Sequence, residues 1–264
     1  MNFFDALILG VLEGFTEFLP VSSTAHLVLA SHALAIVPTE FTKSFIIIIQ
    51  FGTITSVVAL YCKKFLTDWE TNKRIAVAFL PTALIGFALY QLIKGVLLES
   101  IGLIIGVLIA GGVALILLEW LFAGRKESAR VGTDGREQKT SDIPYWKAFA
   151  VGCAQALAIV PGVSRSAATI MGGMLLGLPR TTIVEFSFLL AVPTMAAAAG
   201  YDLLKSAHAF SFAQWDVLAF GFIVAFAAGI AGVKFLLAVV KSHTFIGFGV
   251  YRILAGLLFF FLIF

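Results

Sequence analysis

The chain has 264 residues, of which 60% are hydrophobic and 12% are charged, and its mean hydropathy is +1.02. An ordinary soluble domain has about a quarter charged residues, so this composition excludes that class. The formal net charge of +3 excludes little, because membrane proteins place basic residues mainly for orientation. We therefore expect an all-α polytopic membrane protein, with residues 1–264 forming one integral membrane domain and no nucleic-acid partner.

The sequence predicts six membrane-spanning helices. Each needs about 20 mostly apolar residues, and suitable stretches lie at about 44–62, 75–93, 100–122, 183–204, 216–239 and 246–264. Two more apolar regions, about 3–37 and 145–178, are interrupted midway by proline and hydroxyl residues. Irregular backbone at membrane depth is tolerated only inside protein or beside a wet cavity. Each of these regions is therefore predicted to form a re-entrant hairpin of two half-length helices.

Basic residues predict the orientation. They gather in two segments, 63–74 and 123–147, whereas the loops on the opposite face hold only Lys43, Lys94 and Lys205. The positive-inside rule makes the basic face cytoplasmic, so both termini are expected outside. The polar segment at about 123–144 is expected to be a mobile cytoplasmic linker.

The predicted topology relates the two halves of the chain, about 1–122 and 145–264, as inverted repeats. Each half has one hairpin followed by three spans. Because three is odd, the second hairpin enters from the opposite face of the membrane. Such repeats are related by an axis in the membrane plane and are familiar from transporters. The two hairpin tips are expected to meet near the middle of the bilayer.

Two stretches in the interrupted regions echo each other. They read LEGFTEFLPVSSTAH from Leu12 to His26 and AQALAIVPGVSRSAAT from Ala154 to Thr169. A shift of 142 positions aligns Gly10 with Gly152, Glu13 with Gln155, Ser22 with Ser164, Ser23 with Arg165, and Thr24 with Ser166. Polar groups this dense within hydrocarbon indicate a functional site by default. We interpret the two stretches as two halves of one site.

Glu13 and Glu17 are four residues apart and share one face of a helix. Carboxylate pairs of this kind suit general acid and base catalysis or a Mg²⁺ or Ca²⁺ site. The alternative is a structural pair that is hydrogen-bonded to a neighbouring hairpin turn. Gln155 aligns with Glu13 and keeps its polarity without its charge, so the second half is expected to support the site and not to add an acid.

Ser22, Ser23 and Thr24 follow Pro20, where the second half-helix is predicted to begin. Hydroxyl residues there are natural N-caps, but three in a row exceed what one cap requires. A helix N-terminus also binds anions, and phosphate is the usual occupant. The first hairpin is therefore predicted to present an anion-binding turn.

The second turn, PGVSRS, adds Arg165 between Ser164 and Ser166. A buried guanidinium requires an anionic partner, and its planar fork matches phosphate oxygens. The two helix N-termini and Arg165 together predict a pocket for phosphate or diphosphate. The alternative is a salt bridge from Arg165 to Glu17 or Glu13 that joins the hairpins, and the two interpretations are compatible.

His26 lies three residues after Ser23, within reach on a helical turn. Ser23, His26 and Glu17 resemble a nucleophile, its base and an orienting carboxylate. The alternative for a lone histidine is a structural hydrogen bond.

Three charged residues outside the two motifs are expected to lie near a membrane boundary. Lys234 and Arg252 sit toward the cytoplasmic ends of their spans, where long basic side chains extend to the interface. Glu119 lies near an inner membrane boundary and is interpreted as structural.

EGFTEFLPVSSTAH and PGVSRSAAT closely resemble the two signatures of the undecaprenyl-diphosphate phosphatase family, also called the bacitracin-resistance protein family. QFG at Gln50–Gly52 and EFSFLLAVPT at Glu185–Thr194 are similar to its secondary blocks. The resemblance covers essentially the whole chain and implies hydrolysis of undecaprenyl diphosphate to undecaprenyl phosphate and inorganic phosphate. That reaction would recycle the lipid carrier for peptidoglycan synthesis and confer bacitracin resistance, at the outer face of the bacterial plasma (inner) membrane.

The residue pattern and the resemblance together give candidate roles for individual residues. The catalytic candidates are Glu17, Ser23, His26 and Arg165. The substrate-binding candidates are Glu13, Ser22, Thr24, Gln155, Ser164 and Ser166. Family activity is associated with divalent cations, so Mg²⁺ or Ca²⁺ at Glu13 and Glu17 is the candidate cofactor, and no organic cofactor is expected.

Two classes of function compete. Inverted repeats with broken helices describe a carrier as well as an enzyme, so the alternative is a transporter or flippase of a polyprenyl phosphate. The expected partners are the polyprenyl diphosphate substrate and membrane lipids, and a homo-oligomer is a further candidate assembly. Phosphate release in detergent micelles, which have no two sides, would separate the enzyme from the carrier.

Overall fold

The computed structural model describes residues 1–95, 100–122, 138–206 and 210–264, which form helices and contain no β-strand. Most of the predicted linker at 123–144 lies outside these described residues. The α-helices are α1 (Phe3–Thr16), α2 (Ser23–Ala33), α3 (Glu40–Thr67), α4 (Trp69–Gly95), α5 (Ile101–Phe122), α6 (Tyr145–Ala156), α7 (Arg165–Leu175), α8 (Arg180–Ser206), α9 (Phe212–Ser242) and α10 (Ile246–Ile263). Two short 3₁₀ turns, η3 (Thr140–Asp142) and η4 (Leu157–Ile159), flank α6.

The prediction of an all-α chain with six candidate membrane-spanning helices is confirmed for the residues that the structure describes. Among the described residues, α3, α4, α5, α8, α9 and α10 are long and apolar enough to cross a membrane. Most of them extend past the predicted apolar stretches because capping groups, and not hydropathy, set helix ends. In α3, for example, the Thr39 side chain accepts a hydrogen bond from the Thr42 N–H, so the helix begins at Glu40, before the apolar run.

Each interrupted region forms two helices joined by an irregular turn. The first region gives α1 and α2, and the second gives α6, η4 and α7. The second helix of each pair begins after a serine N-cap with a positive φ, which is 70° at Ser22 and 75° at Ser164. Each serine hydroxyl accepts a hydrogen bond from a backbone N–H three residues later. The sequence echo is therefore also an echo of backbone geometry.

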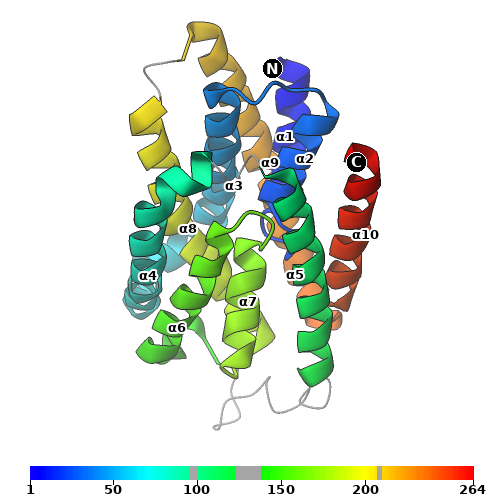
Figure 1. Ribbon diagram of the computed structural model, residues 1–264. Helices are drawn as coiled ribbons and strands as arrows, with labels where there is room; N and C mark the ends of the chain where they lie inside the picture. The colour runs from blue at the N-terminus through cyan, green and yellow to red at the C-terminus, as the bar shows by residue number, and fades with distance from the viewer. Residues whose placement is uncertain (96–99, 123–137, 207–209) are drawn as a thin grey trace.

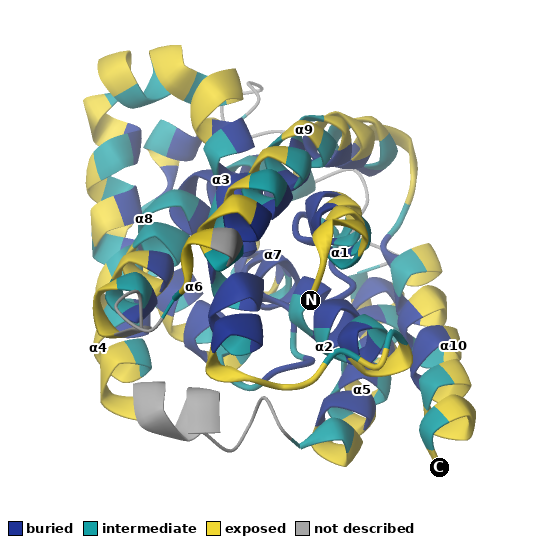
Figure 2. Cartoon of the chain, turned by 90° about the horizontal axis from the view of Figure 1, so that it is seen from above, coloured by how far each residue is buried: buried dark blue, intermediate teal, exposed yellow. Residues whose placement is uncertain are grey.

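The first helix of each pair packs against a long helix of the other half of the chain. Helix α1 packs on α9, and α6 packs on α4. Both termini lie toward one end of the molecule, whereas α6 and α7 lie toward the other end (Figure 1). Seen from above, α1, α2 and α7 lie between the long helices α3, α5, α9 and α10 (Figure 2).

Two glycines allow these cross-half contacts. A Cβ added at Gly10 would lie 2.9 Å from the Gly221 carbonyl oxygen in α9, and one at Gly152 would lie 2.0 Å from the Ala78 carbonyl oxygen in α4. Neither contact is compatible with a side chain, so the absence of a Cβ lets the backbones approach closely, as small residues do in membrane helix pairs. Gly10 and Gly152 are the pair that the sequence shift aligned.

The predicted position of Arg252 at an interface is wrong. Its side chain is fully buried, and its guanidinium donates hydrogen bonds to backbone carbonyl groups in both turns and in α5. Glu119 is also buried, and its carboxylate accepts hydrogen bonds from Arg180 and from the Phe245 N–H, which joins α5 to α8 and to the start of α10.

Candidate active site

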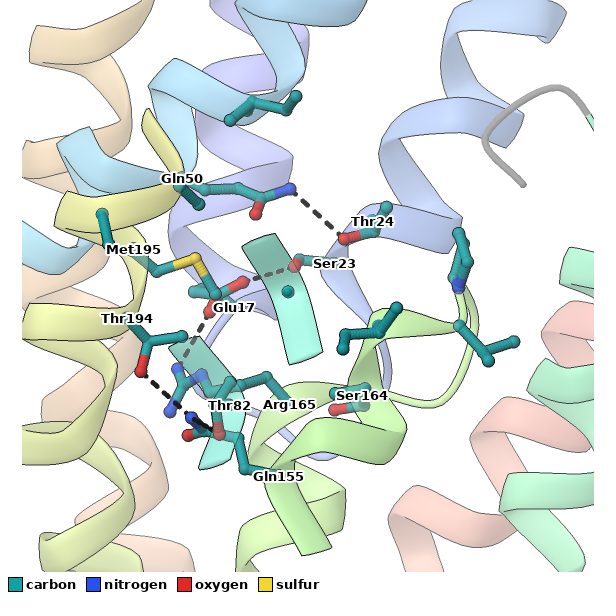
Figure 3. A pocket seen from close by; sticks show the side chains of 18 of the residues that line it. Glu17, Ser23, Thr24, Gln50, Thr82, Gln155, Ser164, Arg165, Thr194 and Met195 are labelled. Atoms are coloured by element: carbon teal, nitrogen blue, oxygen red, sulfur yellow. Dashed lines mark hydrogen bonds and ion pairs between the residues drawn. The ribbon is translucent and has the colours of Figure 1, made fainter. Parts of the chain in front are cut away.

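The two turns meet at a cavity of about 430 Å³ that is lined by both broken segments and by α3, α4 and α8. Its polar lining residues include Glu17, Ser22, Ser23, Thr24, Gln50, Thr82, Gln155, Ser164, Arg165 and Thr194. Most of its remaining wall is apolar, with Phe79 and Phe87 from α4 and Met195 from α8 among the lining side chains. The cavity therefore combines a dense polar cluster with a hydrophobic surface (Figure 3).

Glu17, Ser23 and Arg165 are in direct contact. The Ser23 hydroxyl donates to Glu17 Oε2 at 2.5 Å, and Arg165 Nη2 donates to Glu17 Oε1 at 2.9 Å, as the dashed lines in Figure 3 show. Glu17 is the C-cap of α1, and the other two residues are the first residues of α2 and α7. The predicted salt bridge between the hairpins is thus present, with side-chain exposures of only 6% for Arg165 and 4% for Glu17.

The rest of the Arg165 guanidinium is held by α8. Nη1 donates to the Ser187 carbonyl oxygen at 2.7 Å and lies 3.2 Å from the Ser187 hydroxyl. The buried Nε atom has no acceptor among the described residues. Three of the five N–H donors of Arg165 therefore have acceptors, which fixes the guanidinium in one orientation at the cavity wall. Sequence analysis missed Ser187, although it lies inside the block Glu185–Thr194.

Amide and hydroxyl groups line the cavity around this cluster. Gln50 Nε2 donates to the Thr24 hydroxyl at 3.2 Å. Gln155 Nε2 donates to the hydroxyl groups of Thr82 and Thr194 at 3.1 and 3.0 Å, and its buried Oε1 has no partner among the described residues. Gln50, Thr82 and Thr194 were not predicted as site residues, and the family blocks that contain Gln50 and Thr194 were the available signal.

Ser164 and Ser166 differ in position. Ser164 lines the cavity and caps α7, and its hydroxyl lies 3.0 Å from that of Ser166. Ser166 is fully buried, and its hydroxyl donates to the Leu19 carbonyl oxygen at 2.8 Å. Ser166 therefore links the two turns instead of facing the cavity.

Glu13 and His26 lie beside the cavity and do not line it. The Glu13 carboxylate is fully buried, and neither oxygen has a hydrogen-bond partner among the described residues. His26 Nδ1 lies 2.8 Å from the Ser22 carbonyl oxygen, and Nε2 lies 2.9 Å from the Tyr251 hydroxyl, while the two rings stack. Both ring nitrogens of His26 thus have partners other than Ser23. Of the three residues predicted to act together, Ser23 and Glu17 are hydrogen-bonded to each other, and His26 is bonded to neither.

The electrostatics of the cavity favour an anion. The first N–H groups of α2 and α7 have no partner within their helices, and the positive ends of both helix dipoles meet here. Arg165 adds a full positive charge, which Glu17 offsets. The net attraction for an anion therefore comes from the two helix N-termini.

The carboxylates do not build a closed metal cage. Within the described part of the chain, no three His, Cys, Asp or Glu side chains lie together as metal ligands would. Both oxygens of Glu17 already accept hydrogen bonds. Mg²⁺ commonly binds one or two carboxylates together with substrate phosphates, and Glu17 with Glu13 one turn away fits only that open kind of site.

Comparisons with known proteins agree with the motifs. The family model described as "Bacitracin resistance protein BacA" matches residues 6–258. A relative from Sulfurihydrogenibium sp. (strain YO3AOP1), named undecaprenyl-diphosphatase, is 46% identical over 98% of this chain and 99% of its own length. Relatives of the same name from Aquifex aeolicus and Persephonella marina are 47% and 45% identical, each over 98% of both chains. The chain therefore belongs to the bacitracin resistance protein family.

Proposed function

We propose that this chain hydrolyses undecaprenyl diphosphate to undecaprenyl phosphate and inorganic phosphate, and so recycles the lipid carrier for peptidoglycan synthesis. The observation that carries the proposal is the contact of Ser23 and Arg165 with the two oxygens of Glu17 at one cavity. The two parts of the substrate match the polar and the apolar parts of that cavity. A diphosphate complements the two helix N-termini and Arg165, and a polyprenyl tail complements the apolar wall.

In the proposed mechanism, Ser23 Oγ attacks the terminal phosphorus in line with the bridging oxygen. Its proton passes to Glu17 Oε2, the Oγ–P bond forms, and the P–O bond to the bridging oxygen breaks, which releases undecaprenyl phosphate. Water then attacks the phosphoserine, releases inorganic phosphate and restores the serine hydroxyl. Phosphoryl transfer depends mainly on positioning and charge neutralisation, which Arg165 and the N–H groups of α2 and α7 supply.

Glu17 is the favoured proton acceptor because it already holds the Ser23 hydroxyl, whereas the ring nitrogens of His26 have other partners. The rival mechanism is direct attack by a water molecule that Glu17 activates. The two routes differ in one covalent species, since only the first forms a phosphoserine. Glu17 and Glu13 would hold any Mg²⁺ or Ca²⁺, which would supply charge neutralisation for the diphosphate.

The topology we propose is a pair of inverted repeats whose re-entrant hairpins enter from opposite faces. Three correspondences support it: the capping serines Ser22 and Ser164 share a positive φ, Gly10 and Gly152 make equivalent close contacts, and α1 packs on α9 as α6 packs on α4. The distribution of basic residues then orients both termini and the cavity mouth toward the outside of the bacterial plasma membrane.

Phosphate release in detergent micelles tests the proposal. A micelle does not separate two compartments, so a carrier without hydrolytic activity would give no signal there. The purified protein should release phosphate from undecaprenyl diphosphate. Glu17→Gln should lose that activity by on the order of 10²-fold or more, and the control Glu70→Gln, at an exposed position of α4, should keep it. Absence of release by the wild-type protein would contradict the enzyme and favour the carrier.

A further inference from the structure

Arg252 in α10 is a fully buried cation whose hydrogen-bond acceptors, among the described residues, are all backbone carbonyl groups. An arginine has five N–H donors, and all five are used. They reach the carbonyl oxygens of Gly162 at 2.7 Å, Val163 at 3.0 Å, Leu108 at 3.1 Å, Pro20 at 3.2 Å and Val107 at 3.4 Å. None of the ion pairs among the described residues includes Arg252.

Three of these five carbonyl groups belong to the two turns of the candidate active site. Pro20 lies two residues before the N-cap Ser22, and Gly162 and Val163 directly precede the N-cap Ser164. The other two belong to α5. One guanidinium thus holds the first turn, the second turn and a long helix in a fixed relation. It does so from outside the cavity, because Arg252 is not among the lining residues.

The hydrogen bonds from Arg252 fix the direction of a backbone donor at the cavity. All peptide bonds between described residues are trans, so the carbonyl and N–H of one peptide unit point to opposite sides. The Val163 carbonyl oxygen points to Arg252, and therefore the Ser164 N–H points away from it. Ser164 lines the cavity. Ser22 and Ser164 also have positive φ values of 70° and 75°, and such conformations persist only where the surroundings enforce them.

We propose that Arg252 is a positioning residue for the reaction, which aligns both phosphate-binding turns by clamping the carbonyl groups that precede their capping serines. It makes no contact with the substrate. This role rests on the proposed function, because the turns are aligned for the diphosphate headgroup. An error of about 1 Å in such positions can reduce a rate on the order of 10²-fold.

A glycine in α5 that is not among the lining residues of the cavity allows this clamp to be disturbed. A Cβ added at Gly111 would lie 2.0 Å from Arg252 Nη2, and the flexible end of that side chain would have to move. Gly106 lies in the same helix, and a Cβ added there would have nothing within 4 Å. Gly111→Ala and Gly106→Ala are therefore a matched pair of test and control.

The first measurement is a comparison of kcat and KM in micelles, well below each melting temperature. We expect Gly111→Ala and Arg252→Lys to lose about 10- to 100-fold in kcat/KM, since lysine keeps the charge but has only three donors. Gly106→Ala should match the wild type. A merely structural role would lower the melting temperature and leave kcat and KM unchanged, and that result would overturn the proposal.

The second measurement does not depend on turnover. Hydrogen–deuterium exchange of the first turn of α7 should be faster in Gly111→Ala than in Gly106→Ala, and equal exchange would overturn the clamp. If the wild-type protein released no phosphate, the proposed function would fail, and exchange would still decide whether Arg252 holds the turns. If the wild type were active and both Arg252-disturbing variants were fully active, only the positioning role would fail.

Discussion

Removal of the Arg165 guanidinium should destabilise the protein as well as inactivate it. Arg165→Met preserves much of the side-chain volume but leaves the Glu17 carboxylate buried beside apolar atoms, with a side-chain exposure of 4%. Breaking a buried pair by removing one partner costs about 3–5 kcal/mol because the remaining charge is uncompensated. At about 2–4 °C per kcal/mol for a chain of this size, the melting temperature should fall by about 6–20 °C.

A double-mutant cycle isolates the cause. Glu17→Gln together with Arg165→Met removes both charges, so the double variant should melt above Arg165→Met alone and show a coupling of at least about 1 kcal/mol. The melting temperature of each purified variant would be measured in the same detergent by intrinsic fluorescence. Lys73→Met, which breaks an exposed pair with Glu70, should melt like the wild type. The reasoning would be refuted if Arg165→Met also melted like the wild type, or if the two substitutions were simply additive.

Three further predictions concern His26, the cation and Glu119. His26→Gln should keep more phosphatase activity than Glu17→Gln, because the His26 nitrogens bind Ser22 and Tyr251 instead of Ser23, and activity at or below that of Glu17→Gln would restore histidine as the base. Chelation of divalent cations should lower turnover without lowering the melting temperature of the substrate-free protein, because Glu13 and Glu17 belong to no cluster of three metal-ligating side chains among the described residues. A large fall in the melting temperature would indicate a structural metal. Glu119→Gln should lower the melting temperature and leave KM unchanged, since Glu119 joins α5, α8 and α10, and a change in KM would contradict that role.

Hydropathy and local motifs predict most of this fold because the membrane requires long apolar helices and tolerates irregular backbone only inside protein. Both interrupted regions were located by their proline and hydroxyl clusters. The ends of the long helices were less predictable, since capping side chains such as Thr39 set them. The contact of Glu17 with Arg165 was among the predicted alternatives because a buried guanidinium requires an anion.

The predictions that were wrong or missing concern contacts between residues far apart in the sequence. Arg252 was placed at an interface because it lies near the end of an apolar span, yet α10 packs on α5 and brings it to carbonyl groups of both turns. His26 was assigned to Ser23 by proximity in the sequence, whereas its partner Tyr251 is 225 residues away. Ser187 was missed because a serine inside an apolar span carries no local signal of the arginine that it holds.

The most direct test of the account is the turnover of Ser23→Ala in micelles, measured beside Ser31→Ala. Ser31 lies in the same helix and is also buried, but it does not line the cavity. We predict that Ser23→Ala loses on the order of 10³-fold or more in kcat, that Ser31→Ala keeps wild-type turnover, and that rapid quenching of the wild type traps a phosphoserine at position 23. Full turnover by Ser23→Ala would contradict the assignment of Ser23 as the nucleophile.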